Sequence, residues 1–226
     1  EVMRQHFLGE INDFHQFHCC EEDTIAPLRP ILAEHLVVVV LDQLTEVPKL
    51  VRQVPNRRKH RMQIITTHTG TDFDALASVV ACTLLYPGSM GLLPSMVNPE
   101  VKQFLAIHAD ILRVKPRKGF DLEAIRSLIV VDTNSWKRLD KLDSLAGNKE
   151  LEVICWDHHM EGVSIASIET HREEVGATVT LLLEEMQQRD TPISPMHATL
   201  FLLGIYSDTG CMRYPSVTAR DAAMVS

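Results

Sequence analysis

The chain has 226 residues, of which 45% are hydrophobic and 23% charged, a balance that is typical of a soluble globular protein. Its formal net charge of −8 argues against a sequence-independent grip on a nucleic-acid backbone, and no apolar run is long enough to span a bilayer. Its five cysteines are scattered without a CxxC pair, and no secretory leader is evident. We therefore expect a cytoplasmic protein that has no disulfide framework and no membrane partner.

Residues 1–61 differ in character from the rest of the chain. An apolar run at 31–44 could be a strand or a helix, although its four consecutive valines favour a strand at its centre, and a basic stretch with two prolines follows it. We interpret residues 1–61 as an N-terminal extension or a small accessory segment that ends in a linker.

From residue 62 onward, strand-like and helix-like segments alternate. Apolar or β-branched runs predict three strands, at 62–68, 127–132 and 151–157. Helical spacing of apolar residues predicts five helices, at 72–87, 98–112, 121–126, 176–190 and 194–208. Ser194 and Thr218 have the position and identity of helix N-caps. This alternation predicts an α/β domain over residues 62–226, built on a mainly parallel sheet with helices on both faces.

Polar ligand-type side chains follow each predicted strand, and one more carboxylate ends the helix at 194–208. They are His68, Asp72, Asp74, Asp132, Asp157, His158, His159 and Asp208. In an open parallel sheet the ligand crevice lies beyond the carboxyl ends of the strands, so these groups would converge there if the strands are neighbours. Converging carboxylates repel one another, and they either take up protons or bind cations. Imidazoles beside carboxylates suit Mn²⁺, Fe, Co or Zn²⁺ better than Ca²⁺.

Each of these residues also has a simpler local interpretation. Asp72 could be only the N-cap of the following helix, and Asp132 or Asp208 could only start a turn. Asp157-His158-His159 alone could be a solvated turn at a strand end. The agreement of four such sites at one predicted sheet edge favours a metal centre.

Four segments, read in order, resemble motifs I to IV of the DHH phosphoesterase superfamily. They are "HTGTDFDALAS", "VVDTN", "DHH" and "GIYSDTG", within a match that runs from about Met62 to Ala223. The residues of these segments resemble those of RecJ-like and exopolyphosphatase-related members, and most of all those of the DHH module that precedes CBS and poly(A)-polymerase/tRNA-nucleotidyltransferase domains. Gly70-Thr71 stands where motif I usually carries a pair such as Asn-Pro.

The resemblance implies a role for each site residue. His68 and Asp72 would hold one metal ion, Asp132 would bridge to a second, and Asp74, His158 and Asp208 would complete the second site. His159 would face the substrate phosphate, and Asp157 would orient the histidine pair. With Asp132, these two would form the catalytic set. The expected cofactor is a pair of Mn²⁺ ions, for which Mg²⁺ or Co²⁺ could substitute, and the reaction is attack of a metal-activated water on phosphorus.

The same resemblance implies the substrate class and the partners. The substrate would be a small phosphorylated molecule: polyphosphate, pyrophosphate, a short oligonucleotide or a cyclic dinucleotide. Arg213 and Arg220 follow motif IV and could contact its phosphate, although solvent-facing helix charges are the simpler interpretation. Relatives carry a cap domain after motif IV, which is absent from this chain and expected in the same natural protein, and a homodimer is plausible.

A second function stays open at this point. The chain could be a regulatory metal- or nucleotide-binding DHH module, with weak or no catalysis, inside a larger tRNA- or RNA-processing protein. The start of the helix at 176–190 leaves a similar choice, because its N–H groups could bind an anion or simply pack on the sheet.

Overall fold

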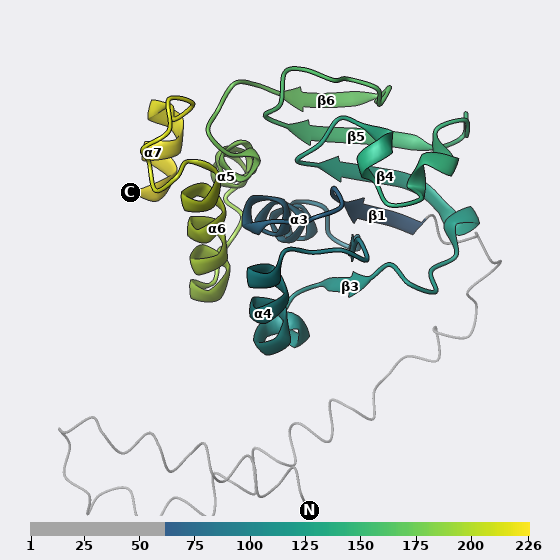
Figure 1. Cartoon of the computed structure of the whole chain (residues 1–226), viewed down its shortest axis with the longest axis horizontal. Helices are drawn as coiled ribbons and strands as arrows, with labels where there is room; N and C mark the ends of the chain where they lie inside the picture. The colour runs from purple at the N-terminus through teal and green to yellow at the C-terminus, as the bar shows by residue number, and fades with distance from the viewer. Residues whose placement is uncertain (1–61) are drawn as a thin grey trace, which may run out of the picture. The chain divides into compact units, whose positions relative to one another are not determined.

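The computed structural model describes residues 62–226, so the predicted extension, its valine-rich strand and the linker lie outside the described residues. A single sheet of six parallel strands forms the centre of this part, in the order β3-β2-β1-β4-β5-β6 (Figure 1). The strands are β1 (Met62–Thr66), β2 (Met90–Leu93), β3 (Val114–Pro116), β4 (Ile125–Val131), β5 (Glu152–Asp157) and β6 (Glu169–Arg172). The α/β class and the parallel sheet predicted from the sequence are thereby confirmed.

Five α-helices and four short 3₁₀ helices connect these strands or follow them. The α-helices are α3 (Phe73–Leu85), α4 (Pro99–His108), α5 (Thr178–Gln188), α6 (Pro195–Asp208) and α7 (Ala219–Val225). The 3₁₀ helices are η4 (Ala109–Ile111), η5 (Leu122–Ala124), η6 (Trp136–Arg138) and η7 (Leu142–Leu145). None of the helices in residues 62–226 has the length and apolar character that a membrane crossing requires.

Helix boundaries follow several of the local signals that the sequence contains, although α4 ends at His108, four residues before the end predicted for it. The hydroxyl of Ser194 accepts from the His197 N–H, and Thr218 forms a reciprocal capping box with Asp221, so both predicted caps are confirmed. The helix predicted at 121–126 is wrong beyond η5, because Ile125 already pairs with Met62 in the sheet.

The sheet carries an apolar core on each face, because side chains alternate along its strands. Ile65 of β1 and Ile129 of β4 lie in one core, with α3, α5 and α6. Ile64 and Leu128 lie in the other, which is closed by η6, η7 and the chain around them. Helices therefore cover both faces, as predicted, but those on the second face are 3₁₀ helices.

The strand order places a topological switch point between β1 and β4. The chain runs outward from β1 to β3 and then returns, so that β4 pairs with the free side of β1. This reversal is the topological switch point at which open parallel sheets bind ligands. Thr66 of β1 pairs with Val130 of β4. His68 and Asp132 each follow two residues later, and their side chains are in contact. In Figure 1 the arrowheads of β4, β5 and β6 point toward the side where α5, α6 and α7 lie.

A glycine in α6 allows this helix to approach α3 closely. A Cβ atom at Gly204 would lie 2.9 Å from the Ala77 Cβ and 3.2 Å from the Phe73 carbonyl oxygen. Asp208 lies one helical turn after Gly204, and Asp74 lies in the first turn of α3. The close approach at Gly204 therefore helps to bring these two carboxylates together.

We expect Gly204→Ala to lower the free energy of unfolding by about 1–3 kcal/mol, because the added methyl group overpacks the interface between α3 and α6. Chemical denaturation of the purified protein measures this change. Gly147→Ala is the matched control, because a Cβ there meets nothing within 4 Å. Equal stability of the two variants would show that the helix contact is not tight.

Candidate metal centre

The structure brings all eight predicted residues to the carboxyl edge of β1, β4 and β5. Their ligand atoms form three overlapping groups, each within 4.8 Å: His68, Asp72 and Asp132; Asp74, His158 and Asp208; and Asp132, His158 and His159. Asp132 belongs to two of these groups and connects the residues that follow β1 to those that follow β5. Asp157 is the last residue of β5 and contacts the third group through His159.

Asp132 lies at the centre of the cluster and is almost completely buried. Its backbone is left-handed, with φ 56°, a conformation that Asp tolerates better than most residues. Its amide N–H donates to the Trp156 carbonyl at 2.9 Å, so the turn is fixed to the end of β5. Burial alone would raise the pKa of Asp132, but the hydrogen bond to His68 and the nearby imidazoles outweigh burial and lower it.

Backbone carbonyls orient two of the imidazoles. Nδ1 of His68 lies 3.0 Å from the Thr69 carbonyl oxygen, and Nδ1 of His158 lies 3.0 Å from that of Val175. A carbonyl can only accept, so each Nδ1 carries the proton and each Nε2 points into the cluster. A metal-binding histidine is commonly held in this way by its other ring nitrogen.

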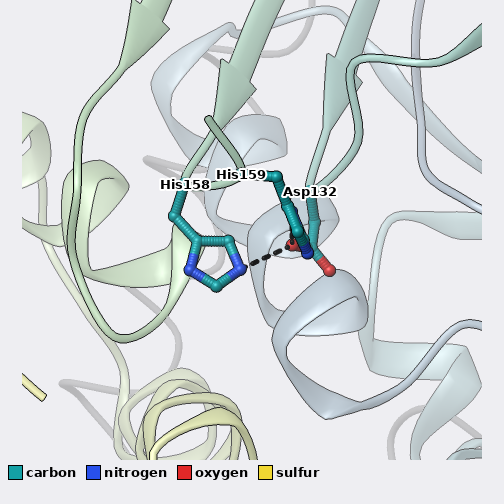
Figure 2. A group of neighbouring side chains, drawn as sticks. All are labelled: Asp132, His158 and His159. Atoms are coloured by element: carbon teal, nitrogen blue, oxygen red, sulfur yellow. Dashed lines mark ion pairs between the residues drawn. The ribbon is translucent and has the colours of Figure 1, made fainter. Parts of the chain in front are cut away.

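The Nε2 atom of His158 is buried and has no hydrogen-bond partner. It lies 3.5 Å from Asp132 Oδ1 and 3.3 Å from Asp208 Oδ2, and a dashed line in Figure 2 joins it to Asp132. A lone pair that faces two carboxylates is unfavourable unless a cation lies among them. His68 Nε2 differs, because it lies 3.1 Å from Asp132 Oδ2 and donates a hydrogen bond to this carboxylate when both ring nitrogens are protonated.

Asp157 orients one histidine of the pair. Its Oδ1 accepts from the His159 backbone N–H at 3.1 Å and from the His159 Nδ1–H at 2.8 Å. This hydrogen bond raises the pKa of His159. The side chain of His159 is 46% exposed, whereas that of His158 is 14% exposed, so His159 is the histidine that solvent reaches. We predicted that Asp157 orients both histidines. In the structure Asp157 orients His159, whereas the Val175 carbonyl orients His158.

Asp74 and Asp208 show the electrostatic strain of the cluster. Burial and the neighbouring Asp132 and Asp208 carboxylates raise the pKa of Asp74 well above its ordinary value. Burial and Asp132 raise the pKa of Asp208 to about 6. Divalent cations would relieve this repulsion and hold both groups in the ionised form.

Asp72 uses its two carboxylate oxygens differently. Oδ1 accepts from the Ala75 N–H at 3.0 Å and caps α3. Oδ2 faces the cluster and lies 3.8 Å from His68 Nε2. The cap that the sequence suggested is therefore present, and it leaves the second oxygen available to a metal ion.

The start of α5 supports the carboxylates through contacts that sequence reasoning missed. The N–H groups of Thr178 and Val179 donate to Asp74 at 2.7 and 2.9 Å, and the Thr178 hydroxyl donates to Asp132 Oδ1 at 2.9 Å. The Gly176 N–H donates to Asp221. Protein carboxylates thus occupy these amides, so the anion-binding interpretation of this helix start is wrong.

Asn134 is a second residue whose importance the sequence did not reveal. Its side-chain amide donates to the carbonyl oxygens of His159 and Glu161, at 3.0 and 3.1 Å. It thereby connects the turn after β4 to the turn after β5. The only sequence signal was its place two residues after Asp132.

The two arginines predicted to contact substrate lie in different surroundings. Arg220 forms ion pairs with Glu173 and Glu184, so its charge is already compensated. The Nε–H of Arg213 donates to the Gly210 carbonyl oxygen at 3.0 Å, and Arg213 is exposed.

The donor set fits divalent metal ions of the kind that accept both nitrogen and oxygen. Two imidazole nitrogens with fixed tautomers and four carboxylates face one another in a largely buried site. Among residues 62–226, His68, Asp72 and Asp132 could hold one ion, and Asp74, His158 and Asp208, with a shared Asp132, a second.

Comparison with known proteins gives one family and several relatives. The family model described as "DHH family, N-terminal domain" matches residues 63–205. An A-adding tRNA nucleotidyltransferase of Geobacter sulfurreducens is 30% identical over 73% of the chain and 19% of its own length. A manganese-dependent inorganic pyrophosphatase of Methanothrix thermoacetophila is 27% identical over 71% of the chain and 51% of its own length.

A solved structure has the same fold at low sequence identity. The exopolyphosphatase-related protein of Bacteroides fragilis superposes with a TM-score of 0.59 at 18% identity, over 73% of the chain and 51% of that protein. The chain thus spans about a fifth of the tRNA nucleotidyltransferase and about half of the pyrophosphatase.

We expect Thr178→Val to weaken Mn²⁺ binding by about 10- to 100-fold, because it removes the hydroxyl that orients Asp132 and keeps the shape of the side chain. Isothermal titration calorimetry with Mn²⁺ measures the affinity, and circular dichroism checks the fold. Thr178→Ser retains the hydroxyl and should bind Mn²⁺ nearly as well as the unchanged protein. An unchanged Mn²⁺ affinity in Thr178→Val would show that the Thr178 hydroxyl is not needed to orient Asp132 for metal binding.

Proposed function

The chain belongs to the DHH family, and we propose that it is a two-metal phosphohydrolase domain acting on a phosphoanhydride or on a short nucleotide phosphodiester. The observation that carries this proposal is the buried Nε2 of His158, which faces Asp132 and Asp208 without a hydrogen-bond partner. Manganese-dependent pyrophosphatases are among the relatives of the chain, which supports the use of divalent metal ions.

We assign the metal ligands from the two groups on either side of Asp132. His68 and Asp72 would bind one Mn²⁺, and Asp74, His158 and Asp208 the other, with Asp132 shared. Mg²⁺ or Co²⁺ could take the same oxygen and nitrogen ligands. When bound, the ions would supply an activated water and neutralise charge on phosphate.

The remaining groups of the site would position and protonate the substrate. Asp157 holds His159 through Nδ1, which leaves Nε2 of this exposed histidine free to face solvent. The raised pKa of His159 favours the imidazolium form, which donates a hydrogen bond to a phosphate oxygen. His159 is therefore the proposed contact to the reacting phosphate, and Asp157 its positioning partner.

A second function is favoured by one specific observation, the 30% identity to an A-adding tRNA nucleotidyltransferase. On this proposal the chain is a metal- or nucleotide-binding regulatory module of a larger RNA-processing protein, with weak or no catalysis. The complete set of candidate ligands favours the hydrolase.

Several features of the whole protein remain predictions. These are the division at residue 61, a following cap domain, a homodimer, a cytoplasmic location, binding of nucleic acid and the substrate contacts of Arg213 and Arg220. The ion pairs of Arg220 argue for a structural role at that position.

We expect Asp132→Asn in the full-length protein to lose tight binding of at least one Mn²⁺ ion and all hydrolysis, because the shared carboxylate loses its charge. Asn tolerates the left-handed backbone of this position, so the turn is retained. Asp190→Asn is the matched control, because Asp190 is also left-handed, with φ 49°, and it follows α5 outside the metal groups. Calorimetry measures the number of bound ions.

Hydrolysis is measured as released phosphate or nucleotide with polyphosphate, pyrophosphate, pAp, di- to tetranucleotides and cyclic dinucleotides. Two ions bound at full occupancy by Asp132→Asn would show that the shared-ligand assignment is wrong. Metal binding without turnover of any substrate would favour the regulatory module.

A further inference from the structure

The charge balance of the proposed site creates a need for another cation. Two divalent ions bring four positive charges, whereas five carboxylates converge: Asp72, Asp74, Asp132, Asp157 and Asp208. Together with a protonated His159 paired to Asp157 these charges balance, so no positive charge is left over before any substrate arrives. A phosphate carries further negative charge, so its approach requires a positive group near the metal ions but outside their ligand set.

Arg138 is fixed beside this edge by its backbone. Its carbonyl oxygen accepts from the Thr69 N–H at 2.8 Å and from the Thr69 hydroxyl at 2.9 Å, and Thr69 directly follows His68. The next residue, Leu139, is buried in the core under η6, so the position of Arg138 does not depend on its own side chain.

The side chain of Arg138 is exposed, on a residue whose backbone is hydrogen-bonded to the neighbour of His68. Within residues 62–226, its side chain has no ion pair or hydrogen bond, unlike the side chains of Arg117, Arg189 and Arg220.

We propose that Arg138 binds a phosphate group of the substrate beside His159. This inference rests on the proposed function and adds a substrate contact from the turn after β4. The guanidinium offers a planar set of N–H donors that can bind two phosphate oxygens at once.

The test measures metal and phosphate binding separately in the full-length protein. Calorimetry with Mn²⁺ alone reports on the proposed metal centre, and titration of inorganic phosphate into the Mn²⁺-loaded protein reports on Arg138. We expect Arg138→Gln to bind Mn²⁺ as the unchanged protein does, and to bind phosphate about 10- to 100-fold more weakly. Arg138→Lys keeps the charge and should recover part of the affinity.

Arg113→Gln is the matched control, because Arg113 is exposed and precedes β3 at the opposite edge of the sheet. It makes the same change in net charge, so its phosphate affinity should stay within about twofold of the unchanged protein.

Each outcome bears on one of the two proposals. Equal phosphate affinity in Arg138→Gln and Arg113→Gln, with Mn²⁺ binding intact, would overturn the role of Arg138 and leave the metal centre standing. Loss of Mn²⁺ binding in Arg138→Gln would also overturn it, because Arg138 would then support the metal site. Failure of the unchanged protein to bind Mn²⁺ would overturn the proposed function and this inference together.

Discussion

Several carboxylates meet around Asp132 and repel one another, and the described part of the chain must offset this repulsion to fold. Asp74 and Asp132 are completely or almost completely buried, and Asp208 lies close to both. Such an arrangement is costly in a folded chain without opposite charges or hydrogen-bond donors. The fold supplies hydrogen-bond donors at the start of α5 and two imidazoles beside the carboxylates. It leaves Nε2 of His158 without a hydrogen-bond partner. On the proposed function, a cation bound beside this nitrogen would offset the repulsion among the carboxylates.

The start of α5 binds carboxylates of the protein itself rather than an external anion. Asp74 accepts two N–H groups from the start of α5, although it belongs to α3 more than a hundred residues earlier. Asp221 of α7 accepts the Gly176 N–H and the Thr180 hydroxyl from the same region. Favourable interaction with the positive end of the α5 dipole therefore stabilises two buried carboxylates, one of which faces the cluster. Asp221 therefore couples α7 to the start of α5, because a movement of α7 would break these two hydrogen bonds.

The long buried strands and their polar ends could be predicted from the sequence, whereas three strands and the supporting contacts could not. β4 and β5 are nearly continuous apolar runs that end in Asp132 or Asp157, a pattern that few other structures produce. β2 and β3 span four and three residues, and β6 is the polar edge strand Glu-Thr-His-Arg, so none has a readable period. Thr178 and Asn134 act across 46 and 25 residues of chain, and no local pattern encodes contacts of that kind.

Asp72 shows why a local interpretation and a site interpretation need not compete. The sequence suggested either a helix cap or a metal ligand, and the structure uses Oδ1 for the cap and directs Oδ2 toward His68. The cap fixes the carboxylate, because rotation of its side chain would break the hydrogen bond to the Ala75 N–H. Asp157 follows the same logic, since the oxygen that receives the His159 backbone N–H also orients the imidazole. In both cases an ordinary turn interaction holds a group in place before any metal or substrate binds, which lowers the entropic cost of binding.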